Sequence, residues 1–158
     1  MTKPSDAVVA FWADYAAVTG ATGPYQVWGF GDDAKPDLMT ELGLLVRDGP
    51  KRATTSREDD YEKDGEPIPA PGDHSVILDG EGHPICIIRT TSVEIRPFGE
   101  VDAAFAWDEG EGDRSLEDWR RGHIWYFDSV GTPIDDTTPV VLERFAKVWP
   151  SPVDPPTQ

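Results

Sequence analysis

The chain has 158 residues, 38% hydrophobic and 28% charged, which is typical of one soluble globular domain with a hydrophobic core. Its 14 basic and 30 acidic residues give a formal net charge of −16, which repels polyphosphate chains and argues against broad, sequence-independent coating of nucleic acid. Recognition of a single nucleotide, or of a nucleic acid at a local basic spot, stays open.

The N-terminal segment predicts an amphipathic helix. Ser5 is a suitable N-cap, and apolar residues recur at intervals of three and four from Val8 to Val18. Gly20 then ends the pattern. Residues 25–30 are aromatic and apolar, and form either a strand or an ordered loop.

A second helix is predicted over residues 36–48, because its apolar residues fall on one face and Gly49 follows as a stop signal. Residues 57–66 are highly charged and have no apolar period, so we expect an exposed loop. From His74 the pattern changes to strands.

Valine and isoleucine dominate residues 75–79 and 84–91, and the intervening Asp-Gly-Glu-Gly is a strong hairpin signal. Residues 91–96 alternate between apolar and polar. Residues 140–149 have no clear period, but their β-branched and aromatic content favours a strand.

Two short helices are expected in the second half of the chain. Residues 100–107 predict the first, and the acidic, glycine-containing residues 108–113 predict a tight loop. Ser115 begins a capping-box pattern, so another helix should start there. It leads by way of residues 125–127 to a turn at 131–133.

No internal repeat divides the sequence. We expect a helical segment over residues 1–24, a main domain over 25–149 and a proline-rich disordered tail over 150–158.

The single Cys86 excludes an intramolecular disulfide and fits a reducing compartment. With no signal-peptide pattern and no apolar stretch of membrane-spanning length, a cytoplasmic protein without a membrane partner is expected. Cys86 itself is interpreted as a buried core residue.

The segment Gly49-Pro50-Lys51-Arg52-Ala53-Thr54 places a lysine and a hydroxyl three residues apart behind a glycine. This spacing occurs often by chance, and a helix stop followed by a solvated lysine is the simpler interpretation. A threonine hydroxyl needs a base to become a good nucleophile, and a desolvated lysine can be that base. A charged Lys51 would instead bind a phosphate or polarise a carbonyl.

The acidic segment 108–113 forms either a solvated loop before a helix or a support for a carboxylate beside the lysine. Divalent-metal binding by Glu109, Glu111 and Asp113 is a third option, although the spacing does not match a calcium loop. We assign no metal ligands from the sequence.

Histidines and tryptophans add weaker candidates. The spacing of the three histidines does not match a zinc site. His123 is either a partly buried structural residue on a helix face or a neighbour of a small basic spot. Trp28 and Trp125 are candidates for base stacking, although most tryptophans are expected in the core.

Together these segments resemble the ASCH family, whose members are related to the PUA domain, and in particular its longer bacterial branch. The resemblance spans roughly residues 25–149. It rests on Gly49-x-Lys51-x-x-Thr54, Trp28-Gly29-Phe30-Gly31, residues 67–73 ending in Gly72-Asp73, the strands from Val76 to Val93, and residues 105–113 followed by Ser115-Leu116, Trp119 and His123.

The resemblance implies an α+β fold with a PUA-like small β-barrel flanked by helices, and a cleft that binds RNA or a modified nucleoside. Some members hydrolyse the acetylated nucleoside N4-acetylcytidine, and some longer bacterial members look like ribonucleases. In the amidohydrolases the lysine and threonine of the signature act with a glutamate that follows the barrel strands. Glu109 matches that glutamate, and Glu111 is the fallback because this chain has extra residues at 110–113.

We therefore expect a hydrolase, either an amidohydrolase or a ribonuclease, with no cofactor other than a divalent metal in the ribonuclease case. The alternative is a non-catalytic RNA reader with a basic surface built from Lys51, Arg52, Arg57, Arg120 and Arg121. The expected catalytic residues are Lys51, Thr54 and Glu109, and the expected substrate-binding residues are Trp28, Arg52, Glu111, Asp113 and His123.

Overall fold

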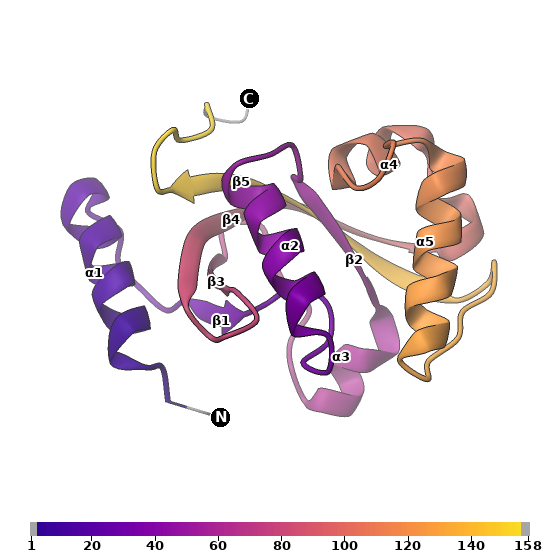
Figure 1. Cartoon of the computed structure of the whole chain (residues 1–158), viewed down its shortest axis with the longest axis horizontal. Helices are drawn as coiled ribbons and strands as arrows, with labels where there is room; N and C mark the ends of the chain where they lie inside the picture. Colours follow the sequence, from indigo (N-terminus) through magenta and orange to yellow (C-terminus); the bar gives the residue numbers. More distant parts are fainter. Residues whose placement is uncertain (1–2, 156–158) are drawn as a thin grey trace. The chain divides into compact units, whose positions relative to one another are not determined.

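The structure, a computed structural model, describes residues 3–155 (Figure 1). The chain divides into two compact units, each assembled from separate segments. Unit 1 comprises Met1–Gly49, Gly72–Arg89 and Ala146–Gln158, and unit 2 comprises Pro50–Pro71 and Thr90–Phe145.

Five strands form one mixed sheet, hydrogen-bonded in the order β1-β3-β4-β5-β2. Strand β1 pairs with β3 in parallel, whereas the β3–β4 and β2–β5 pairs are antiparallel. The long strands β4 and β5 contribute residues to both units. The strands are β1 (Gln26–Trp28), β2 (Ala53–Arg57), β3 (His74–Leu78), β4 (Pro84–Pro97) and β5 (Pro139–Trp149).

Unit 1 contains the helices α1 (Asp6–Thr19) and α2 (Pro36–Arg47). The predicted cap of α1 is confirmed, because the Ser5 side chain accepts a hydrogen bond from the backbone N–H of Val8. The helix ends at Gly20, whose φ of 77° is left-handed. The core of this unit gathers Val8, Tyr15, Val76 and Ile87.

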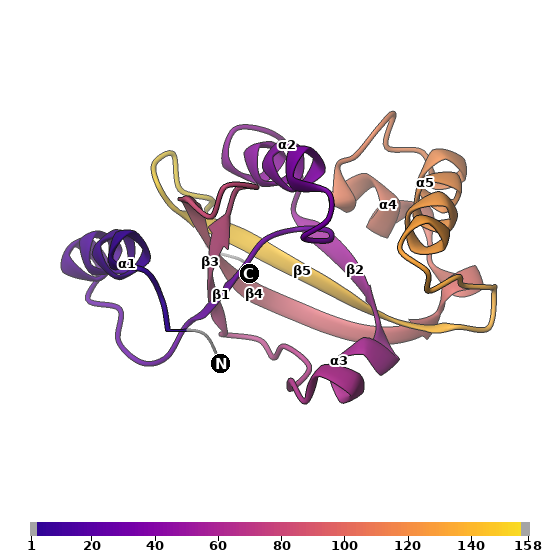
Figure 2. The same cartoon turned by 60° about the horizontal axis from the view of Figure 1, so that its bottom comes forward.

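Unit 2 contains α3 (Glu58–Asp64), a short 3-10 helix (Phe98–Glu100), α4 (Ala103–Glu109) and α5 (Leu116–Ser129). Helices α4 and α5 lie side by side (Figures 1 and 2). Asp102 and Ser115 cap their N-termini by accepting backbone hydrogen bonds. The core of unit 2 consists of Ala53, Phe98, Val101, Phe105, Ala106, Trp119, Val140 and Leu142.

Each large side chain of this core contributes roughly 1.5–3 kcal/mol by leaving water. Phe98 and Phe105 are both 1% exposed, and both rings contact Trp119. Trp119, on the apolar face of α5, therefore holds α4 in place. This packing sets the position of the residues at the end of α4.

The α+β class, the hairpin, the strand over residues 140–149 and the buried Cys86 are confirmed. The exposed loop predicted over residues 57–66 is wrong, because Glu58–Asp64 form α3. Three acidic residues in its first turn and a left-handed Gly65 at its end stabilise this helix without an apolar stripe.

Two boundaries also differ from the prediction. The helix expected over residues 100–107 begins at Ala103 and continues to Glu109, after the short 3-10 turn. The helix that starts after Ser115 runs through residues 125–127 and ends at Ser129.

Residues 156–158 of the predicted tail lie outside the described part of the chain. Within the described part, the Asp154 side chain accepts a hydrogen bond from the backbone N–H of Lys147. Between residues 3 and 155, no helix is both long and apolar enough to cross a membrane.

Candidate functional site

The site lies entirely in unit 2 and begins with strand β2. Side chains alternate between the two faces of a strand, so Ala53 and Thr55 share one face and Thr54 points to the other. Ala53 is fully buried in the core beside Phe105 and Trp119. Thr55 donates its hydroxyl to Glu109 Oε1 at 2.6 Å. The hydroxyl that joins the cluster is thus that of Thr55, which the spacing of the motif did not indicate.

Gly110 brings the end of α4 against the start of β2. A Cβ atom added at this glycine would lie 2.8 Å from both the Cα and the N of Lys51. The backbone N–H of Arg52 donates to the carbonyl of Asp108 at 2.8 Å, which fixes the same contact. Gly110 has a φ of 70°, a conformation that side chains rarely adopt. Glycine is therefore required here both for space and for backbone shape.

Four titratable side chains meet around this contact, and we call them the charge cluster: Lys51, Glu109, Glu111 and His123. Lys51 Nζ lies 2.6 Å from Glu111 Oε2 and 3.9 Å from Glu109 Oε2, and it donates to the Ala53 carbonyl at 2.8 Å. His123 Nε2 lies 2.6 Å from Glu109 Oε2. Lys51 and Glu109 are each 1% exposed. Two cations and two anions therefore share a site that is almost closed to water.

The hydrogen bonds of His123 indicate its charge state. Its Nδ1 lies 2.7 Å from the carbonyl oxygen of Trp119, which can only accept, so Nδ1 carries a proton. Its Nε2 faces the Glu109 carboxylate, and a second proton there makes the ring an imidazolium. The ring also stacks on Trp119, with the centroids 4.3 Å apart.

The pKa shifts follow from the same contacts. Burial favours the neutral carboxyl of Glu109, but the charges of His123 and Lys51 and the hydrogen bonds from His123 and Thr55 outweigh it, so its pKa lies well below the ordinary value. Burial also opposes the imidazolium of His123, yet the charge of Glu109 raises its pKa. Burial raises the pKa of Glu111, and Lys51 offsets this only in part. Glu111 therefore takes up a proton more readily than an ordinary glutamate.

The other predicted site residues lie elsewhere. Arg52 donates from Nη1 to the Lys51 carbonyl at 2.7 Å, so it borders the cluster through the backbone. Asp113 is exposed, and hydrogen bonds with the Ser115 side chain and backbone N–H lower its pKa and make it part of a turn. Trp28 belongs to unit 1, where its ring packs edge-on against Phe30.

The arginines proposed for a basic surface in unit 2 are already bonded to neighbouring groups. Arg57 pairs with Asp59 at 2.9 Å, and Arg121 pairs with Glu117 at 3.2 Å. Arg120 donates to the Gly99 carbonyl at 3.0 Å. Lys51 is buried in the charge cluster. With Lys51 buried and these arginines bonded to neighbouring groups, the described contacts add no support to the RNA-reader interpretation.

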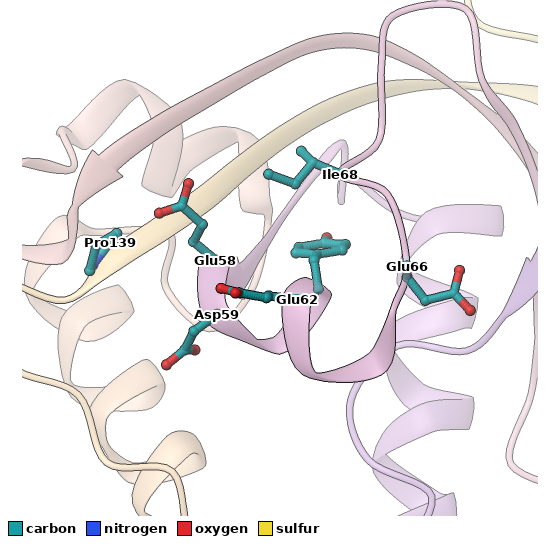
Figure 3. A pocket seen from close by; sticks show the side chains of 7 residues that line it. Glu58, Asp59, Glu62, Glu66, Ile68 and Pro139 are labelled. Carbon is teal, nitrogen blue, oxygen red and sulfur yellow. The ribbon is translucent and has the colours of Figure 1, made fainter.

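Unit 2 also contains a pocket of about 470 Å³ beside α3 (Figure 3). Four acidic side chains from α3 and the residues just after it line this pocket, and Tyr61 and Ile68 contribute apolar surface. Such a lining repels phosphate groups, so this pocket is a poor site for a nucleic-acid backbone. Its lining residues are Glu58, Asp59, Tyr61, Glu62, Glu66, Ile68 and Pro139.

A metal site was a further option for the acidic segment. Across residues 3–155, no group of three or more His, Cys, Asp or Glu side chains has an arrangement that could hold a metal ion. The carboxylates of Glu109 and Glu111 are instead neutralised by Lys51 and His123.

Comparisons with known proteins agree with this architecture. One solved structure, a protein from Enterococcus faecalis V583 of the family DUF984, has a TM-score of 0.78 and 32% identity over 89% of this chain and 87% of that chain. Another, an ASCH domain from Lactobacillus crispatus JV V101, has a TM-score of 0.77 and 28% identity over 93% of this chain and 97% of that chain. A comparison with curated protein sequences gives no match.

These similarities confirm the predicted α+β fold with a PUA-like, barrel-like sheet. The model of the ASCH domain family matches residues 26–149, which is most of the sequence and includes every member of the charge cluster. The chain therefore belongs to the ASCH family.

Proposed function

We propose that this chain is a hydrolase that removes the acyl group from a small modified nucleoside, with N4-acetylcytidine as the representative substrate. The observation that supports this proposal is the buried charge cluster, in which Lys51 contacts one strongly ionised carboxylate, Glu109, and one with a raised pKa, Glu111. Neighbouring carboxyls whose pKa values are shifted in opposite directions are typical of acid–base chemistry.

Each member then has a separate role. Lys51 donates a hydrogen bond to the acyl oxygen and stabilises the negative charge that develops there. Glu111 takes a proton from a water molecule, and the oxygen of that water bonds to the acyl carbon. When the carbon–nitrogen bond breaks, Glu111 returns the proton to the leaving nitrogen, so the products are a carboxylic acid and the free amine. Glu109 stays ionised and keeps the Lys51 ammonium in place.

The signature threonine offers a second nucleophile. Thr54 would attack the acyl carbon if Lys51 removed its proton. Two observations favour water instead: Thr54 points to the face of β2 opposite Thr55, and the Lys51 ammonium is paired with Glu111. Replacing each threonine separately tests this choice, as described in the Discussion.

The charge distribution favours a small substrate over RNA. The chain carries a net charge of −16, and the pocket beside α3 is lined by carboxylates. A ribonuclease that cleaves single strands, or a reader that binds RNA without cleaving it, would need cationic contacts to several phosphates. These two activities are the alternative outcomes of the test.

The test is turnover of N4-acetylcytidine, measured as acetate release by the purified protein and by Lys51→Ala. We expect Lys51→Ala to lower kcat/KM by about 100-fold or more, the loss typical of removing an oxyanion donor. Lys63→Ala, which removes an exposed lysine of α3, is the matched control and should leave turnover unchanged.

A second arm uses a short single-stranded RNA with magnesium or manganese, and again with chelator. Acetate release that survives Lys51→Ala would remove the proposal. Lysine-dependent RNA cleavage would replace it with the ribonuclease assignment, and RNA binding without any turnover would replace it with the reader.

A further inference from the structure

The four members of the charge cluster differ sharply in how far solvent reaches them. The side chains of Lys51 and Glu109 are 1% and 2% exposed, and that of His123 is 12% exposed. The Glu111 side chain is 33% exposed, although its Oε2 lies only 2.6 Å from Lys51 Nζ. Glu111 is therefore the member through which the cluster meets the solvent.

The two carboxylates are also held very differently. Glu109 is bonded to His123 and Thr55, each at 2.6 Å, and it lies in the last turn of α4. The hydrogen bond described for the Glu111 carboxylate joins it to Lys51. Releasing Glu111 breaks one ion pair, whereas releasing Glu109 would also leave a buried imidazolium without its carboxylate, which is far more costly.

Glu111 also differs from Glu109 in its position along the chain. Glu111 follows the end of α4 and precedes Ser115, the cap of α5, so it lies in the connection between the two helices. Gly110 and Gly112 on either side of it have φ values of 70° and 59°. Both glycines approach neighbouring groups closely, so the backbone here stays in place, and the half-buried Glu111 carboxylate leaves Lys51 by rotation of its own side chain.

We infer that Glu111 is a gate over Lys51: its carboxylate covers the ammonium, and a ligand oxygen reaches Lys51 only by displacing it. With the Glu111 carboxylate turned from Lys51 toward the ligand, where it can act as the base, Lys51 and His123 face only one anion, Glu109. The vacated position then favours an oxygen that carries or develops negative charge, as an acyl oxygen does during hydrolysis. The identity of this ligand oxygen rests on the proposed function, whereas the gate itself does not.

Acetylation of lysines by acetic anhydride, read by peptide mass spectrometry, tests the gate without any turnover. The rate at Lys51 is divided by the rate at the exposed Lys63 of the same molecule. We expect this ratio to rise at least tenfold in Glu111→Ala. Glu117→Ala, which removes an 81% exposed carboxylate of α5, is the control and should leave the ratio unchanged.

If Glu111→Ala does not fold, a second variant of the same residue tests the gate. Glu111→Gln preserves the shape of the side chain and removes its charge, and should raise the ratio at least threefold. An unchanged ratio in the folded variants would overturn the gate. If the ratio rises but no nucleoside is hydrolysed by the wild-type protein, the gate stands and the proposed function fails.

Discussion

Lys51 and Glu111 form a 2.6 Å ion pair, although 60 positions separate them in the sequence, and Glu109, two residues before Glu111, lies 3.9 Å from the same ammonium. A continued helix would direct the side chains of Glu109 and Glu111 to nearly opposite sides. Because α4 ends at Glu109 and Gly110 reverses the local backbone, both carboxylates face one lysine. The ion pairs therefore depend on the glycine between them.

Gly110→Ala should destabilise the protein by about 1–3 kcal/mol, because its backbone has positive φ and the new Cβ would lie 2.8 Å from Lys51. Chemical denaturation measures this change. Gly122→Ala in α5 is the matched control, since a Cβ added at this glycine meets no atom within 4 Å. This substitution should stabilise the helix by roughly 0.5–1 kcal/mol. Equal effects of the two substitutions would contradict the close approach at Gly110.

Thr55→Val should lower the free energy of unfolding by roughly 1.5–3 kcal/mol, because it removes a hydrogen bond to the buried, ionised Glu109. The adjacent substitution Thr54→Val makes the same change of side chain without removing a hydrogen bond to Glu109, so it should lower the free energy of unfolding by less. Urea titration of both variants compares them directly. A larger loss in Thr54→Val would reverse the assignment of the two faces of β2.

The same pair of variants distinguishes the nucleophiles. If water attacks the acyl carbon, Thr54→Val should release acetate from N4-acetylcytidine at a rate close to that of the wild type. A folded Thr54→Val protein with no turnover would instead support Thr54 as the nucleophile and require a different arrangement of Lys51 during the reaction.

Much of the fold could be predicted because its local signals are strong. Ser5 and Ser115 are good caps before apolar residues, and Asp-Gly-Glu-Gly separates two β-branched segments. The helix α3 could not be predicted from the sequence, because it is short and highly charged and therefore shows no apolar period. Its stability comes from favourable end charges and a glycine cap, which a search for apolar spacing does not detect.

The grouping of the candidate residues could be anticipated only in part. The sequence indicated Lys51, Glu109, Glu111 and His123 as candidates, and the structure brings all four together. The motif could not show that Thr55 makes the hydrogen bond to Glu109, because strand register decides which of two adjacent threonines faces α4. The pairing of His123 with Glu109 depends on how α5 packs on α4, which no local pattern encodes.

His123→Ala should lower the free energy of unfolding by about 3–5 kcal/mol at pH 6, because it leaves the buried Glu109 carboxylate without its closest cation. Arg121→Ala is the control on the same helix, since its side chain is 68% exposed and its ion pairs lie at the surface. Denaturant titration of both variants makes the comparison. A change in His123→Ala as small as that of the control would contradict an ionised pair.

The stability of the wild-type protein should depend on pH above about 6.5, the ordinary pKa of histidine. The folded state raises the pKa of His123, mainly through Glu109, so the stability gained from the imidazolium is fully present below pH 6.5 and is lost as the pH rises through the raised pKa. Lys51 and Glu111 also lie next to the His123–Glu109 pair. His74, in unit 1, titrates separately, because burial lowers its pKa.

The variant His123→Gln retains those other groups, so the difference between it and the wild type isolates His123. Free energies of unfolding measured from pH 6 to pH 9 should fall for the wild type and change less for His123→Gln. If the two proteins lose stability in parallel over this range, His123 does not carry the proton that neutralises Glu109, and the charge cluster would hold one cation fewer than its geometry indicates.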